Sequence, residues 1–128
     1  MELKTHLKID RSLCGEVVVL EEGYAKVELE TTERMRADEE GLVHGGFCFG
    51  AADFAAMAAV NDPNVVLAKS TSKFIAPVRV GEIVVFEAEV VSQEGRKRQV
   101  KVTGNVEQTD VYEGTFDTVV LENHVLSI

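Results

Sequence analysis

The stretch from Leu42 to Asn61 reads LVHGGFCFGAADFAAMAAVN, and it decides how the rest of the chain must fold. From Phe47 to Val60 every residue is apolar, glycine or alanine, with the exception of Asp53. A helix that is apolar on all sides is buried by other elements, and its many alanines favour helix formation. We therefore predict a central helix that the other elements surround.

Asp53 is the residue of this helix that needs a reason. An ionised carboxylate is costly to bury unless it is paired or hydrogen-bonded, and burial usually raises its pKa. Just upstream, His44, Gly45 and Gly46 stand where the helix should begin. Free backbone N–H groups and the helix dipole favour negative charge or a polarised carbonyl oxygen there, and glycines let a substrate approach closely. An oxyanion hole and a carboxylate nucleophile or base are the parts of an acyl-transfer site.

The spacing of these groups predicts that two chains cooperate. His44 and Asp53 are nine positions apart, which is roughly 13 Å along a helix, too far for both to act on one carbonyl group. Two antiparallel copies of the helix across a dimer axis would bring them together. A simpler interpretation is also open, in which the two glycines only form a turn and Asp53 pairs with a neighbouring Arg or Lys.

Length and composition limit the possible classes of protein. The 128 residues suffice for one domain with a core, and we predict a single domain over 1–128. A formal net charge of −9 argues against nucleic-acid binding, which requires a basic surface. The chain has neither an uncharged apolar run long enough for a bilayer nor the apolar core of a secretory signal. We therefore expect no membrane partner and a cytoplasmic location.

The cysteines and histidines do not predict a metal site. Two cysteines are too few for a disulfide framework, the three histidines are scattered, and no spacing matches a zinc motif. Cys48 has no charged neighbour in sequence that would lower its pKa, so we interpret it as a small hydrophobic residue.

Outside the helix the chain alternates between apolar and polar residues in a way typical of strands. We predict a hairpin at 16–20 and 24–30, a solvated connection at 31–40, and strands at 65–75, 83–92, 96–107 and 111–121. Residues 1–12 are compatible with a short helix or an extended arm. An antiparallel sheet of five or six strands must then curl around one long helix, with the remaining helix face closed by a partner or by strand edges. The predicted fold class is α+β.

Two segments of the chain resemble those of a known family. HGGFCFGAAD at 44–53 and SKFIAPVRVGE at 72–82, which contains the motif Pro-Val-x-x-Gly, occur in the order found in hotdog-fold acyl-CoA thioesterases. The resemblance is to the branch that includes the phenylacetate-pathway enzymes. It implies a homodimer whose sheets join edge to edge, possibly paired again into a tetramer, with two sites at the interface. The ligand implied is an acyl-CoA, and since CoA is part of the substrate, no separate cofactor is implied.

The same resemblance implies roles for the residues at the helix start. The backbone N–H of Gly45, together with that of Gly46, would polarise the thioester carbonyl, and His44 would shape the turn. Asp53 of the facing subunit would be either the nucleophile or the general base that activates water, and both roles stay open.

A second group of residues is expected to contact substrate: Phe47, Phe49, Asp38, Met57 and Arg79. Asp38 stands where family members commonly have Asn or Gln, and an acidic group there could raise the pKa of the catalytic carboxyl. Met57 offers no hydroxyl where some relatives have one. Phe47 and Phe49 would line the acyl pocket unless they are simply core. Arg79 would hold the CoA phosphates, for which the charged run 96–98 is a weaker candidate because it lies at a hairpin tip.

Three functions are compatible with these patterns. The first is hydrolysis of an acyl-CoA to a free acid and CoA. The second is a non-catalytic binding module for acyl-CoA or malonyl-CoA, because residues 68–82 and 111–116 also resemble the effector domain of bacterial fatty-acid biosynthesis repressors. The third, a dehydratase or hydratase on the same fold, would need a different spacing of His and acid from the one found here.

Overall fold

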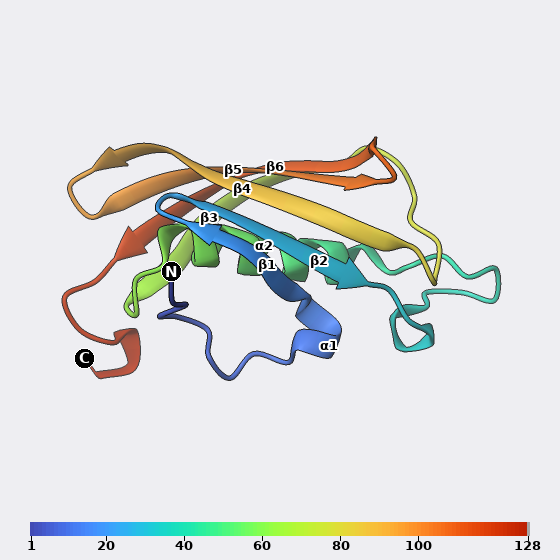
Figure 1. The fold of residues 1–128 in the computed structure, drawn as a ribbon, viewed down its shortest axis with the longest axis horizontal. Helices are drawn as coiled ribbons and strands as arrows, with labels where there is room; N and C mark the ends of the chain where they lie inside the picture. Colours follow the sequence, from blue (N-terminus) through green and yellow to red (C-terminus); the bar gives the residue numbers. More distant parts are fainter. Residues whose placement is uncertain (128) are drawn as a thin grey trace.

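The structure is a computed structural model that describes residues 1–127, and it contains one six-stranded antiparallel sheet and one long helix (Figure 1). The strands are β1 (Glu16–Glu21), β2 (Tyr24–Glu30), β3 (Val65–Phe74), β4 (Ile83–Glu94), β5 (Lys97–Val106) and β6 (Thr109–Val120). Their order across the sheet is β1-β2-β4-β5-β6-β3. The helices are α1 (Arg11–Cys14) and α2 (Gly45–Val60), and short 3-10 turns lie at Glu33–Met35 and Val125–Ser127.

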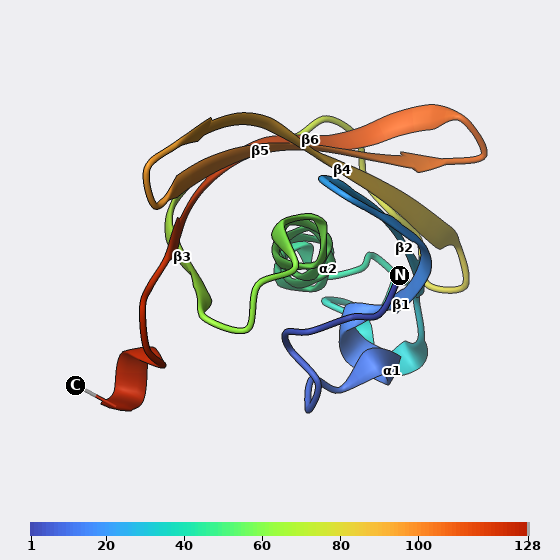
Figure 2. The ribbon, with the colours of Figure 1, turned by 60° about the vertical axis from the view of Figure 1, so that its left-hand side comes forward.

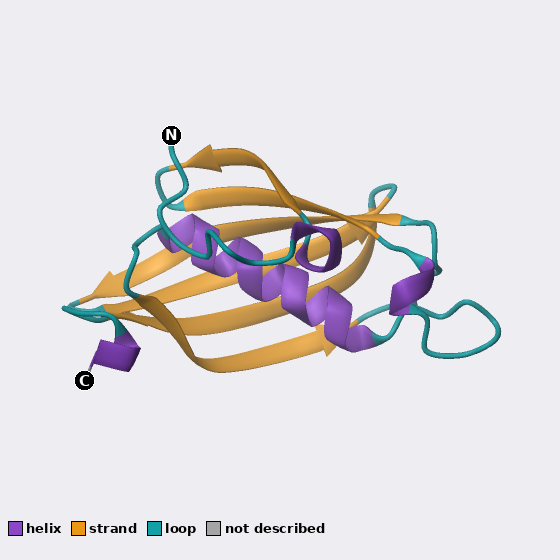
Figure 3. Ribbon diagram, turned by 90° about the horizontal axis from the view of Figure 1, so that it is seen from below, coloured by secondary structure: helices purple, strands orange, loops and turns teal. Residues whose placement is uncertain are grey.

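The sheet curls around α2, which lies on its concave face (Figures 2 and 3). The register shifts by one residue in four of the five strand pairs. Such bulges bend a strand and increase its local twist, which allows a sheet of this length to wrap a cylinder. The sheet stays open, with β1 and β3 as its two edges. The predicted hotdog fold is confirmed.

The concave face of the sheet holds the aromatic core. Phe86 on β4 and Tyr112 and Phe116 on β6 are at most 1% exposed. Gly104 makes room for two of them, because a Cβ atom there would lie 2.7 Å from Cε1 of Phe86 and 3.2 Å from Cβ of Tyr112. A Cβ at Gly114 would lie 2.7 Å from the Tyr112 hydroxyl. Gly104 and Gly114 are therefore needed for core packing, because the neighbouring aromatic rings occupy the space that a larger side chain would need.

The helix α2 ends at Val60, the last residue of the apolar run. Asn61 adopts the left-handed conformation, with φ 52° and ψ 47°, and its N–H donates to the Met57 carbonyl at 2.8 Å. Asn tolerates this conformation better than most residues, which makes it a suitable C-cap.

The first fourteen residues cover part of the side of α2 that the sheet leaves open (Figure 2). The amide of Asn61 holds this segment, accepting from the Lys4 N–H at 2.7 Å and donating to the Glu2 carbonyl at 2.9 Å. The ring of His6 packs 6.3 Å from that of Phe54 on α2. The sequence is compatible with either a short helix or an extended arm at residues 1–12, and the structure has only the short helix α1 at Arg11–Cys14 at the end of an irregular segment. The whole segment helps to close the core.

The predicted solvated connection at 31–40 is only partly solvated. Met35 in its 3-10 turn is fully buried, and the Thr31 hydroxyl donates to the Glu82 carbonyl at 2.6 Å. These contacts fix the connection before α2 begins. Within residues 1–127, no helix is long and apolar enough to cross a bilayer.

Candidate active site

The start of α2 presents two backbone donors without acceptors. His44 is the N-cap residue, and its own N–H donates to the Met35 carbonyl at 2.8 Å. The N–H groups of Gly45 and Gly46, the first two residues of the helix, have no acceptor within residues 1–127. With the positive end of the helix dipole, these donors suit an oxyanion or a polarised carbonyl oxygen.

The neighbours of the two glycines explain why side chains are absent there. A Cβ at Gly45 would lie 3.4 Å from the ring of Phe74, and a Cβ at Gly46 would lie 3.2 Å from the ring of His44. The exposed His44 ring also meets Phe47 edge-on at 6.2 Å. His44 therefore shapes the first turn of the helix through packing, since its side chain makes no capping hydrogen bond.

Asp53 is a carboxylate without a partner. Its Oδ1 atom is buried and accepts no hydrogen bond, and the ion pairs among residues 1–127 all involve other carboxylates. Burial raises the pKa of Asp53 from 3.8 to about 6. The interpretation that Asp53 pairs with a neighbouring Arg or Lys is therefore wrong within one protomer. Within the single chain, burial accounts for this raised pKa.

The two halves of the candidate site lie apart on one helix. Gly45 and Asp53 are eight positions apart, which is roughly 12 Å along α2. A single chain therefore cannot bring both groups to the same carbonyl carbon, as their spacing in the sequence predicts.

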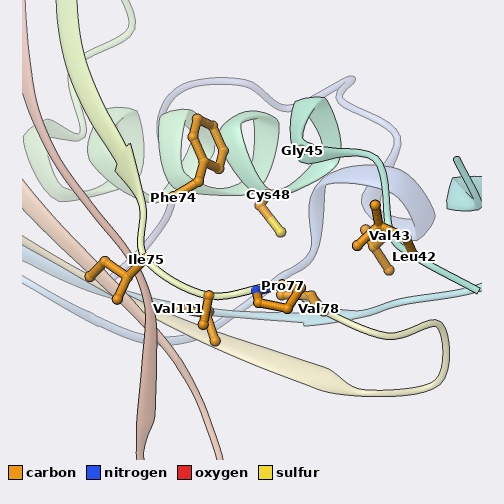
Figure 4. A pocket seen from close by; sticks show the side chains of 10 residues that line it. Leu42, Val43, Gly45, Cys48, Phe74, Ile75, Pro77, Val78 and Val111 are labelled. Atoms are coloured by element: carbon orange, nitrogen blue, oxygen red, sulfur yellow. The ribbon is translucent and has the colours of Figure 1, made fainter.

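A pocket of about 260 Å³ opens beside Gly45 (Figure 4). Its ten lining residues come from the start of α2 and the residues just before it, from the end of β3 and the segment after it (residues 74–78), and from β6. Those outside 74–78 are Leu42, Val43, Gly45, Cys48 and Val111. The thiol of Cys48 points into this space (Figure 4), and burial raises the pKa of that thiol to about 11, so Cys48 is the small hydrophobic residue that the sequence predicts.

The predicted substrate contacts on α2 differ in their burial. Phe47 and Phe49 are half-buried and pack against the core, with the Phe49 ring 5.7 Å from that of Phe116. Met57 is 1% exposed within the core, so one protomer leaves it no surface for substrate. The roles predicted for all three as substrate contacts remain predictions.

Two other predicted contacts lie on exposed loops. Asp38 accepts hydrogen bonds from the N–H groups of Glu40 and Leu42 at 2.9 and 3.2 Å, which fixes the loop before the helix. Arg79 is exposed, and its backbone forms a β-bridge with Leu42, which brings it near the pocket. By contrast, the charged run 96–98 belongs to its hairpin, where Arg96 pairs with Glu122 and Arg98 donates to turn carbonyls.

Sequence reasoning missed the residues that β3 and β6 bring to this region. Phe74 lies beside Gly45, and the Tyr112 hydroxyl bonds to the Ser72 hydroxyl at 2.6 Å. Burial raises the pKa of Tyr112, the hydrogen bond with Ser72 lowers it, and the negative charge of Asp53 raises it. The only signal in the sequence was the strand alternation that places Tyr112 on the inner face.

The comparison with protein families identifies the kind of protein. The family model described as "Thioesterase superfamily" matches residues 40–113, which include the helix, the pocket and the segment after β3. The chain belongs to the thioesterase superfamily.

Two curated relatives of this thioesterase-superfamily chain are longer proteins. Transcription factor FapR of Caldanaerobacter subterraneus is 32% identical over 113 residues, which are 88% of this chain and 56% of FapR. A protein of Aquifex aeolicus named methylthioribose-1-phosphate isomerase is 50% identical over 121 residues, which are 94% of this chain and 26% of that protein. The chain thus spans about half of one relative and about a quarter of the other.

Solved structures share the whole fold of this superfamily member. An uncharacterized protein of Pyrococcus horikoshii is 49% identical, with a TM-score of 0.97 and coverage of 98% of this chain and 97% of that one. A mutant of the phenylacetic acid degradation protein PaaI of Thermus thermophilus is 26% identical, with a TM-score of 0.79 and coverage of 87% and 96%. A hypothetical thioesterase of Streptococcus pneumoniae, solved with coenzyme A, is 18% identical, with a TM-score of 0.77 and coverage of 85% and 87%.

Proposed function

We propose that this protein hydrolyses a CoA thioester to a free acid and CoA. The observation that carries the proposal is Asp53, whose buried Oδ1 has no partner and whose pKa is about 6. A carboxylate with a pKa near neutrality is suited to take a proton from water at physiological pH, because it is both ionised and sufficiently basic. The superfamily membership and the fold shared with a structure that contains coenzyme A support this substrate class.

In the proposed reaction, both halves of the site act on the same thioester carbonyl. The free N–H groups of Gly45 and Gly46 bind the thioester oxygen as it gains negative charge. In the general-base route, Asp53 takes a proton from water, the water oxygen bonds to the carbonyl carbon, the C–S bond breaks, and the proton passes to the CoA thiolate. In the nucleophilic route, the Asp53 carboxylate attacks the carbonyl carbon and the C–S bond breaks, which releases the CoA thiolate and leaves a mixed anhydride. Water then hydrolyses the anhydride to the free acid, which regenerates the Asp53 carboxylate and supplies the proton that the thiolate takes up.

The proposed site forms between two subunits. The outer edge of β3 has no neighbouring strand in the sheet, and Phe74 and Ile75 at its end are 55% and 42% exposed. An open edge beside exposed apolar side chains is a surface that a second copy can cover. A dimer built on this edge would align two α2 helices antiparallel, so that Gly45 of one subunit meets Asp53 of the other.

Substitution of Gly45 tests the oxyanion hole. Gly45→Val is expected to lower kcat by about 10²-fold or more, because its branched side chain would stand beside the Phe74 ring and block the approach to the N–H group. Gly50→Ala on the same helix is the control, because no atom lies within 4 Å of a Cβ there. The release of free thiol from a series of acyl-CoA esters provides the readout, and an unchanged rate in Gly45→Val would remove the proposed oxyanion hole.

Mixing two inactive variants tests whether the site crosses subunits. The variants Asp53→Asn and Gly45→Val are co-expressed in equal amounts. A dimer that contains one subunit of each kind should have one intact site, while each variant alone stays inactive. Random pairing predicts about a quarter of the wild-type activity in the unseparated mixture. Activity that stays at the level of the single variants would show that each site lies within one subunit.

A non-catalytic sensor is the second candidate function. It is favoured by the 32% identity to FapR, which extends over 88% of this chain. A sensor would bind a CoA thioester saturably without releasing thiol, whereas the proposed enzyme releases thiol in every cycle. Thiol release from a panel of acetyl-, malonyl-, hexanoyl-, palmitoyl- and phenylacetyl-CoA, measured beside calorimetric binding of each, distinguishes the two.

A further inference from the structure

The pocket beside Gly45 has an uncharged lining. All ten of its lining residues are glycine, cysteine or apolar. Its polar groups near the reacting centre are the Gly45 N–H and the thiol of Cys48, which burial keeps protonated. A carboxylate placed in this pocket would lose its hydration and gain no cation in return, which is costly, whereas an apolar group would gain from burial.

The place and size of the pocket indicate which part of a thioester it takes. Gly45 belongs both to the pocket lining and to the free N–H pair at the helix start, so a group bound there lies next to the reacting carbonyl. A volume of about 260 Å³ is below the ~300–1,000 Å³ typical of sites that bury a complete drug-sized ligand. The pocket therefore suits one segment of an acyl-CoA and not the whole molecule.

The mouth of the pocket is also apolar. Leu42, Phe74 and Ile75 all line the pocket, yet they are 40%, 55% and 42% exposed. Lys73 and Arg79 are the charged residues that flank residues 74–78 in sequence, and neither lines the pocket; Arg79 joins this region through its backbone bridge to Leu42. Within one chain, an acyl group that enters from the carbonyl thus crosses apolar side chains, of which Phe74 and Ile75 also stand at the proposed dimer edge.

We propose that this pocket binds the acyl chain of the thioester and selects uncharged, apolar acyl groups of medium length over those that carry a terminal carboxylate. The inference rests on the proposed function, since it assigns the acyl part of the same site. It also separates this chain from a malonyl-CoA sensor, whose ligand ends in a carboxylate. Cys48 is the residue through which the pocket can be resized, because its thiol points into the space (Figure 4).

The first arm of the test uses the wild-type protein. The values of kcat/KM for hexanoyl-CoA and phenylacetyl-CoA are expected to exceed those for malonyl-CoA and succinyl-CoA by at least about 10²-fold, because the pocket offers no partner for the carboxylate. Equal or faster hydrolysis of malonyl-CoA would overturn the pocket assignment and leave the thioesterase function intact.

The second arm resizes the pocket. Cys48→Ala should shift the chain-length optimum toward longer acyl groups, and Cys48→Leu should shift it toward shorter ones. Cys14→Ala is the matched control, because Cys14 lies on α1 and does not line the pocket. An unchanged circular dichroism spectrum and an unchanged thermal unfolding midpoint show that each variant is folded. If Cys48→Leu does not fold, the substrate comparison with the wild type and the chain-length profile of Cys48→Ala still test the proposal.

Two further results would also test the inference. An unchanged chain-length profile in both Cys48 variants, together with a weaker dimer in sedimentation, would show that a side chain of the partner subunit fills the pocket. If no ester is hydrolysed, the proposed function fails, and calorimetry with thioether analogues of hexanoyl-CoA and malonyl-CoA then tests the pocket separately. Tighter binding of the hexanoyl analogue supports the assignment, and tighter binding of the malonyl analogue overturns it.

Discussion

Asp53→Asn is expected to lower thioester hydrolysis by about 10²–10⁴-fold, because the variant loses the group that accepts a proton from water or attacks the carbonyl carbon. The side chain is nearly isosteric, so the fold and the binding of CoA esters should be preserved. Asp110→Asn, at an exposed position on β6, is the matched control and should keep wild-type activity. Retained turnover in Asp53→Asn would exclude the proposed role of this carboxylate.

The raised pKa of Asp53 also predicts how activity depends on pH. Both proposed routes need the ionised carboxylate, so kcat/KM should fall as pH drops below about 6, by about tenfold per pH unit. The residual activity of Asp53→Asn should not show this decrease at low pH. A wild-type profile that is flat from pH 5 to pH 8 would contradict the assignment of Asp53 as the group that must be ionised.

The same substitution is expected to stabilise the protein near neutral pH. Because the pKa of Asp53 is about 6 in the folded state against an ordinary 3.8, the folded state binds a proton more tightly than the unfolded state does. The free energy of unfolding of the wild type should therefore decrease as pH rises from about 4 to 7, and Asp53→Asn escapes this loss. We expect the variant to be more stable by about 1–2 kcal/mol at pH 8, allowing for partial exposure.

Chemical denaturation of both proteins at pH 4 and pH 8 measures this effect. The difference in unfolding free energy should nearly vanish at pH 4, where the folded wild type carries a neutral Asp53. A difference that is the same at both values would contradict the buried charge as its source. The functional carboxylate is thus expected to lower stability, as is common where an active site holds a desolvated charge.

The second large effect is expected in the core, where Phe86 faces Gly104. The two residues are directly paired across β4 and β5, and Phe86 is fully buried. Phe86→Ala should lower the free energy of unfolding by about 3–5 kcal/mol, because it removes a ring and leaves a cavity. Gly104→Val should lower it by about 1–3 kcal/mol or more, because its Cβ would lie 2.7 Å from the Phe86 ring.

The double variant shows whether these two effects share one cause. In Phe86→Ala/Gly104→Val the valine can occupy space that the ring has left, so the loss should be smaller than the sum of the single losses by at least about 1 kcal/mol. Val91→Ala on the same strand is the control, since Val91 is 49% exposed and should change stability little. Additive losses in urea denaturation would show that the glycine does not make room for the ring.

Much of the fold could be predicted because the relevant signals are local. The alternation of β5 places Val100 and Val102 on the buried face, and both are fully buried. Residues 31–40 show the limit of this reasoning. Their high charge predicts solvent exposure, but Met35 and Thr31 are held by partners that are distant in the sequence.

The candidate site could be predicted only in part. The free N–H groups at Gly45 and the unpaired carboxylate of Asp53 follow from an apolar helix that begins after two glycines and holds one charge. The burial of Met57 and the partial exposure of Phe49 do not follow, because a helix that is apolar on all sides gives no periodic signal for which face meets the sheet.

The sequence by itself determined the central helix, the sheet that wraps it, and the two chemical groups at Gly45 and Asp53, because each depends on neighbours along the chain. Only the tertiary structure decided the pocket, because Phe74 and Val111 reach Gly45 through the pairing of β3 with β6. The pKa of Asp53 is likewise a tertiary property, since it arises from desolvation by segments that are far apart in the sequence.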